Sequence, residues 1–277
     1  MRLTVVGCSG SYPGPDSPAS CYLVEHEGHR ILLDLGNGAL GPLQRYADLY
    51  YIDAVVLSHL HADHCLDLTS YYVVRKYRPE GPAPSIPVLG PTGTAERMAA
   101  AYDLPDTPGM TGEFDFLDHV ADTEIGPFRI RTATANHPVE AYAIRVDAGG
   151  RSLVFSGDTG PTDNLVDLSR GTDLALYEAS FLSRYPDLPP DLHLTAAQAA
   201  EHAMRAGVGR LVLTHLVPWT PQDETREEAA AVYDGDLALA TPGLALGILP
   251  RRRCRICCAP CRFRSRSGSG AGLGSSS

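Results

Sequence analysis

The chain has 277 residues, of which 44% are hydrophobic, and it carries a formal net charge of −10. This composition is typical of a soluble globular protein, and no apolar run approaches the roughly 20 residues that a membrane span needs. Seven arginines and no acidic residue lie in residues 251–277, which leaves about −17 on the first 250 residues. Such an acidic body disfavours a nucleic-acid polymer as the substrate.

The N-terminal segment, Met1 to Gly7, enters an apolar strand directly and leaves no room for a signal peptide. We therefore expect a cytoplasmic protein with no membrane partner. Short apolar runs between turn residues predict the elements of the first half. They are strands at 3–6, 21–25, 30–34, 54–57 and 88–89, and helices at 39–47, 65–76 and 94–102.

In the second half, strands come first and then alternate with helices. The predicted strands are 114–117, 128–132, 141–146, 152–155, 174–177 and 211–213, and the helices are 196–206 and 225–233. Thr195 followed by Gln198 fits a capping box at the start of the helix at 196–206. This order predicts an α/β protein with two sheets covered by outer helices.

The central motif is Ser58-His59-Leu60-His61-Ala62-Asp63-His64, which follows the apolar run 54–57. It places three imidazoles and one carboxylate at the end of a predicted buried strand. Neutral imidazole is the commonest zinc ligand, and a carboxylate suits a second divalent ion. Three histidines in a polar surface loop would be the alternative, but the H-x-H-x-D-H spacing after a buried strand favours a metal site.

Three more residues follow predicted strands in the same way. They are His137, Asp158 and His215. Each alone is a weak signal, because strand-end histidines and aspartates are common. Together with the central motif they supply five imidazoles and two carboxylates, enough for two ions if one carboxylate bridges.

These motifs, taken in order, resemble the metallo-β-lactamase superfamily over roughly residues 1–248. The resemblance implies an αββα sandwich with two metals at one edge of the sheets. It implies that His59, His61 and His137 hold one ion, that Asp63, His64 and His215 hold the other, and that Asp158 bridges them. Two zinc ions are the first expectation for the cofactors, and manganese or iron would also be compatible.

Within the superfamily, the chain is more similar to ribonuclease Z and its small phosphodiesterase relatives, through the segments 7–11, 177–181 and 193–200. This similarity implies that Glu178 and His193 form a pair that assists the leaving group, and Asp63 could orient the hydroxide. Ribonuclease Z carries a long exosite arm between the positions of His137 and Asp158, where only twenty residues intervene here. In ribonuclease Z the loop after the first strand carries a lysine and an arginine near the phosphate backbone, whereas the corresponding loop here, residues 13–20, has neither. We therefore expect a small phosphodiester substrate rather than tRNA.

The chain also resembles a group of actinobacterial cyclic-nucleotide phosphodiesterases, in the segments 14–20, 43–45, 64–68, 190–194 and 218–220. The function that this resemblance implies is hydrolysis of 3′,5′-cAMP-like substrates through a metal-bridging hydroxide. A ribonuclease Z-like tRNA 3′-end endonuclease, a lactone or thioester hydrolase and a non-catalytic binding scaffold are the alternatives.

Three residues are candidate substrate contacts. Ser9 and Ser11 lie in a Gly/Ser loop whose backbone N–H groups could face an anion, and Trp219 could stack on a base. Superfamily relatives of this size are often dimers, so a homodimer is a further expectation.

From residue 251 the composition changes to Arg, Cys, Ser and Gly. We expect one hydrolase domain over residues 1–250 and a basic tail over residues 251–277, either a disordered extension or a frameshifted reading of the gene's end. Cys254, Cys257, Cys258 and Cys261 could form a four-thiolate zinc site, but their spacing is compressed and nothing nearby would fold around them.

Overall fold

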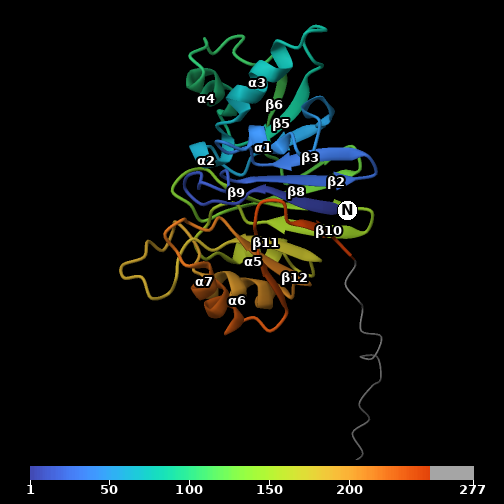
Figure 1. The fold of residues 1–277 in the computed structure, drawn as a ribbon. Coiled ribbons are helices and arrows are strands. Elements are labelled where there is room, and N and C mark those ends of the chain that lie inside the picture. Colours follow the sequence, from blue (N-terminus) through green and yellow to red (C-terminus); the bar gives the residue numbers. More distant parts are fainter. Residues whose placement is uncertain (250–277) are drawn as a thin grey trace, which may run out of the picture.

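Two seven-stranded sheets pack face to face in the computed structural model, which describes residues 1–249 (Figure 1). The first sheet has the order β14 (Ala245–Gly247), β1 (Arg2–Gly7), β2 (Cys21–His26), β3 (His29–Leu33), β4 (Ala54–Val56), β5 (Ile86–Gly90) and β6 (Phe114–Asp118). The second has the order β13 (Asp236–Leu239), β12 (Arg210–Thr214), β11 (Leu174–Glu178), β10 (Arg151–Phe155), β9 (Tyr142–Ala148), β8 (Phe128–Thr134) and β7 (Asp122–Ile125).

The apolar core between the sheets follows from the two-residue period of the strands. Leu3 and Val5 of β1 pack with Phe155 of β10 and Val212 of β12 between the two sheets. Val6, the next residue of β1, faces the opposite way and packs with the outer helices. Each sheet is therefore apolar on both faces and needs a covering layer on its outer side.

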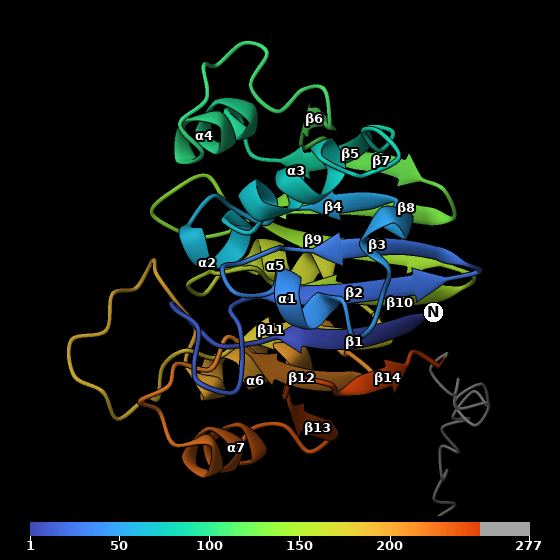
Figure 2. The ribbon, with the colours of Figure 1, turned by 45° about the horizontal axis from the view of Figure 1, so that its top comes forward.

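Helices supply that layer on both sides, as Figures 1 and 2 show. The first sheet is covered by α1 (Leu40–Leu43), the 3-10 turn η1 (Leu49–Tyr51), α2 (Ala62–Cys65), α3 (Leu68–Lys76) and α4 (Thr94–Ala101). The second is covered by α5 (Asp163–Leu168), α6 (Ala196–Ala206) and α7 (Gln222–Ala230). The predicted αββα sandwich is confirmed, and so is the capping box of Thr195 and Gln198 on α6. None of the helices within residues 1–249 combines the length and apolar composition needed to cross a bilayer.

The predicted helix 65–76 is α3, which begins later, at Leu68; Leu66 and Asp67 separate it from α2, which lies largely within the central motif. Backbone groups at the end of α2 form hydrogen bonds with Leu35 in a neighbouring loop rather than with the next helical turn. The Leu35 N–H donates to the His64 carbonyl at 2.8 Å, and the Asp67 N–H donates to the Leu35 carbonyl at 3.1 Å. Because these groups are already paired, the helical ladder cannot pass through this point.

Other boundaries differ as well. The predicted helix 39–47 is only α1, and the predicted helix 225–233 is α7, which begins at Gln222. The elements β7, α5, β13 and β14 were not predicted at all. All four are short, and the three strands are edge strands with partly exposed side chains, so their apolar pattern is weak. The predicted tail and its four cysteines lie outside the described residues.

Candidate active site

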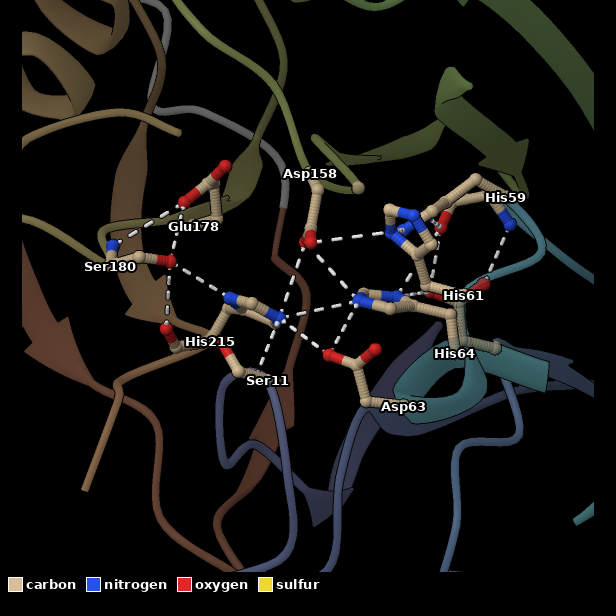
Figure 3. Close-up of polar contacts among 12 residues, drawn as sticks. Ser11, His59, His61, Asp63, His64, Asp158, Glu178, Ser180 and His215 are labelled. Carbon is tan, nitrogen blue, oxygen red and sulfur yellow. Dashed lines mark hydrogen bonds and ion pairs between the residues drawn. The ribbon is translucent and has the colours of Figure 1, made fainter. Parts of the chain in front are cut away.

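The seven predicted ligands converge at one edge of the sandwich, where strands of both sheets end. Figure 3 labels six of them: His59, His61, Asp63, His64, Asp158 and His215. We call His59, His61 and His137 the outer cluster, since His61 and His137 are solvent-accessible. The Nε2 atom of His59 lies 3.0 Å from His61 Nδ1, and His137 Nε2 lies 3.3 Å from the same atom. Three ring nitrogens therefore face a single point, as one metal ion requires.

We call Asp63, His64, Asp158 and His215 the inner cluster, and all four are buried. His64 Nε2 and His215 Nε2 are 3.2 Å apart, and His215 Nε2 is 3.2 Å from Asp63 Oδ2. This second group of ligand atoms adjoins the outer cluster without sharing its imidazoles.

Asp158 lies between the two clusters. Its Oδ1 is 3.2 Å from His64 Nε2 and 3.4 Å from His215 Nε2, whereas its Oδ2 is 3.8 Å from His59 Nε2. One oxygen therefore faces the inner cluster and the other the outer cluster, which is the placement of a bridging carboxylate.

The donor atoms fit two divalent ions. Among the described residues, Asp158 Oδ1 is buried and makes no hydrogen bond, and such an atom is costly unless a ligand satisfies it. Burial lowers the pKa of His59 and of His137, so their imidazoles are neutral. Although burial opposes its ionisation, the adjacent His215 and His64 imidazoles hold the pKa of Asp63 well below its usual range. Metal binding needs neutral imidazoles and ionised carboxylates. Burial disfavours the charged form of His64, but Asp158 and Asp34 raise its pKa, so binding of an ion at the inner cluster would displace a proton from His64.

A buried carboxylate that the sequence analysis did not assign, Asp34, orients one ligand of each cluster. Its Oδ2 accepts from His64 Nδ1 at 2.6 Å and from the Ser58 hydroxyl at 2.8 Å. Since the Ser58 hydroxyl donates to Asp34, its oxygen accepts from His59 Nδ1, 3.1 Å away. Both imidazoles therefore carry their proton on Nδ1 and present Nε2 to a metal. A carboxylate directly after a buried strand next to β4 was the available signal for Asp34.

Glu178 repeats this arrangement at the end of β11. Its Oε2 accepts from the Ser180 hydroxyl at 2.8 Å, and the oxygen of that hydroxyl lies 2.8 Å from His215 Nδ1. Its Oε1 lies 2.9 Å from His193 Nδ1. Burial disfavours the charged form of His193, but the Glu178 carboxylate favours it more strongly and raises the pKa of His193 to about 9. The predicted pair of Glu178 and His193 is thus in contact, and His193 Nδ1 also lies 3.9 Å from Asp158 Oδ2.

The local backbone is shaped to bring these side chains together. Asp34, His215 and Ser11 have φ values of 57°, 54° and 63°, a left-handed conformation that is uncommon for non-glycine residues. Gly10 lies so close to this turn that a Cβ atom there would be 2.5 Å from the His215 carbonyl oxygen. The loop after β1 is therefore packed directly against the last ligand loop.

The three candidate substrate contacts lie in these two loops. The Ser9 hydroxyl donates to the Tyr12 carbonyl at 2.7 Å, and the Ser11 N–H donates to His215 Nε2 at 3.3 Å. Trp219 is exposed and pairs with Tyr12. Ser11 adjoins the inner cluster, and the substrate roles of all three stay predictions.

Comparison with known proteins agrees with this geometry. The family model described as "Beta-lactamase superfamily domain" matches residues 29–216. An uncharacterized protein of Mycobacterium tuberculosis, Rv1339, is 45% identical over 85% of this chain and 88% of its own length. A ribonuclease Z of Mycobacterium bovis is 30% identical over 91% of this chain and 100% of its own.

The crystal structure of the metallo-β-lactamase fold protein YhfI from Bacillus subtilis has a TM-score of 0.80 at 27% identity. The match covers 89% of this chain and 99% of that one. The convergence of the seven candidate ligands, with Asp158 between the two clusters, and the family match together lead to one conclusion. The chain belongs to the metallo-β-lactamase superfamily, and it is a metal-dependent hydrolase.

Proposed function

We propose that this protein is a two-metal phosphodiesterase that hydrolyses 3′,5′-cyclic nucleotides, with cAMP as the representative substrate. The observation that carries the proposal is the position of His193. It is held by Glu178 at 2.9 Å, lies 3.9 Å from Asp158 and belongs to neither the outer nor the inner cluster, although with Glu178 and His215 it forms a third group of potential ligand atoms. A two-metal site with an additional fixed proton donor suits a reaction that expels an alkoxide.

The two clusters would hold the ions, which we propose to be zinc because imidazole predominates among the ligands. When bound, such ions supply a water nucleophile at neutral pH and polarise the phosphoryl group. The inner-cluster residue Asp63 presents a carboxylate oxygen at this site, and it would orient the attacking water. These residues would favour in-line attack on phosphorus.

His193 would act on the leaving group rather than on the attacking water. Because its Nδ1 proton is directed to Glu178, its Nε2 nitrogen is the one available to the substrate. It would donate a proton to the departing 3′ oxygen, and the product would be the 5′-monophosphate. Glu178 would keep the imidazole in the orientation and protonation state that this step needs.

The short chain segment between His137 and Asp158 supports a small substrate. It consists of a short loop and the hairpin of β9 and β10, whose register joins Ala148 to Arg151 around Gly149 and Gly150. This hairpin occupies the interval where the resemblance to ribonuclease Z implies an exosite arm.

The 30% identity to a ribonuclease Z favours tRNA 3′-end cleavage as a second candidate. A mobility-shift assay with precursor tRNA separates the two, because the acidic body and the short hairpin predict no tight binding at physiological salt. A tight complex followed by 3′-end cleavage would favour the second candidate.

The proposal is tested by turnover of 3′,5′-cAMP with protein reconstituted with zinc or manganese, beside bis-p-nitrophenyl phosphate and a thioester. We expect both phosphodiesters to be cleaved and the activity to be lost in His64→Ala. Cleavage of the artificial phosphodiester alone would contradict the assigned substrate. Cleavage of the thioester alone would contradict phosphodiester chemistry.

A further inference from the structure

Two exposed aromatic side chains pair beside the candidate active site. Tyr12 is 46% exposed and Trp219 is 58% exposed. Their ring centroids are 5.9 Å apart, with an interplanar angle of 34°. Trp219 is also the single tryptophan of the chain. Tryptophan is highly buried on average, and it is enriched at binding interfaces.

The loops that carry the pair are anchored. The Gly10 N–H donates to the Leu216 carbonyl at 3.2 Å, and the Leu216 N–H donates to the Cys8 carbonyl at 3.2 Å. On the other side of Trp219, the Thr220 hydroxyl lies 3.1 Å from the Tyr185 hydroxyl. The two rings are thus presented by fixed backbone, which lowers the entropy cost of binding a ligand.

Both loops lead directly from the inner cluster. Tyr12 follows Ser11, whose N–H donates to His215 Nε2 at 3.3 Å. Consecutive Cα atoms are about 3.8 Å apart, so the Tyr12 backbone adjoins the metal ligands. Trp219 lies four residues after His215. A group attached to the phosphate by one sugar could therefore reach the pair.

The Ser11 N–H adds a second point of recognition. An imidazole nitrogen that coordinates a metal has no lone pair left to accept a hydrogen bond. When His215 Nε2 is so engaged, the Ser11 N–H becomes available to a phosphate oxygen.

From this arrangement we propose that Tyr12 and Trp219 form the surface on which the planar base of a mononucleotide substrate stacks, with its phosphate toward Ser11. The inference rests on the proposed function and narrows it, since it requires substrates that carry a base. Stacking on aromatic side chains tolerates every base, because each has a π face. We therefore expect cyclic purine and pyrimidine nucleotides to be used alike.

The first test is intrinsic fluorescence of the zinc-loaded protein, in which Trp219 is the only tryptophan. We expect saturable quenching by AMP and none by ribose 5-phosphate, the same phosphate without a base. Tyr12→Ala keeps the fluorophore, and AMP should then bind roughly 10-fold more weakly. Equal responses to AMP and ribose 5-phosphate, or unchanged affinity in Tyr12→Ala, would overturn the proposal.

The second test is kinetic. Trp219→Ala should raise KM for 3′,5′-cAMP roughly 10- to 100-fold with little change in kcat, and Trp219→Phe should recover most of the loss. Tyr51→Ala, at a tyrosine that is 67% exposed on η1, is the matched control and should behave as wild type. Unchanged KM in Trp219→Ala with active protein would refute base stacking while leaving the phosphodiesterase intact.

The two proposals fail separately. Quenching by AMP with no turnover of 3′,5′-cAMP would support the stacking surface and contradict the proposed function. If a single-stranded oligonucleotide quenched much more strongly than AMP, a nucleic-acid strand would replace the mononucleotide as the occupant and the proposal would be wrong.

Discussion

Two buried carboxylates, one from each sheet, are arranged alike around the site. Asp34 follows β3, and Glu178 ends β11. Each carboxylate contacts one imidazole directly and a second through a serine hydroxyl: His64 and His59 for Asp34, His193 and His215 for Glu178. These contacts orient all four imidazoles with Nδ1 toward the carboxylate or the serine hydroxyl.

The difference lies in what the imidazoles do. Both histidines around Asp34 are candidate metal ligands, one in each cluster. Around Glu178 only His215 belongs to the two clusters, and His193 is the proton donor of the proposed function. In that proposal the same carboxylate–serine arrangement would support metal binding alone at one sheet, and metal binding plus proton transfer at the other.

The largest effect on metal binding is expected at Asp34, because it orients one candidate ligand of each ion. Asp34→Asn should weaken each ion about 10- to 100-fold and reduce activity at limiting zinc at least about 10²-fold. Zinc titration followed by elemental analysis measures this loss. Asp115→Asn, at an exposed aspartate on β6, is the control. Retention of two tightly bound ions in Asp34→Asn would contradict the role of Asp34 in orienting a ligand of each ion.

His193→Ala should separate catalysis from metal binding. Both ions should stay bound, while kcat falls roughly 10²–10⁴-fold, the usual contribution of a general acid. The readouts are zinc stoichiometry and steady-state turnover of the same preparation. A fully active variant would show that His193 is not the acid.

Ser180→Ala should affect only the inner cluster. It removes the hydroxyl between Glu178 and His215, so we expect about 10- to 100-fold weaker binding of one zinc ion and normal binding of the other. Ser183→Ala is the matched control, since its hydroxyl contacts Glu228 and Thr195 rather than a ligand. Identical zinc isotherms for Ser180→Ala and Ser183→Ala would contradict this role.

Ser58→Ala should have the smallest effect and act on the other ion. Asp34 would keep its bonds from His64 and from the backbone N–H at position 58, so only the orientation of His59 is relaxed. We expect less than about 10-fold weaker binding at the outer cluster. Isothermal titration should place this change on the ion that Ser180→Ala leaves unaffected, and a change on the same ion would argue against two separate supports.

The sequence predicted the fold class, and it identified seven candidate ligands that the structure brings together, because they lie in segments that follow apolar strands. It did not predict the roles of Asp34, Ser58 and Ser180, whose partners are distant in the chain and are determined only when the sheets pack. His215 and Ser180, for example, are 35 residues apart. The strands β7 and β13 were not predicted for a different reason. Few of their side chains are buried, so their sequences have only a weak apolar pattern.

The two-metal phosphodiesterase account is tested most directly by hydrolysis of 3′,5′-cAMP in H₂¹⁸O, with mass spectrometry of the product. Protein holding two zinc ions should give 5′-AMP with one ¹⁸O in its phosphate, and Asp158→Ala should give none. If protein with two bound ions formed no labelled 5′-AMP, or if Asp158→Ala formed it at the wild-type rate, the account would be contradicted.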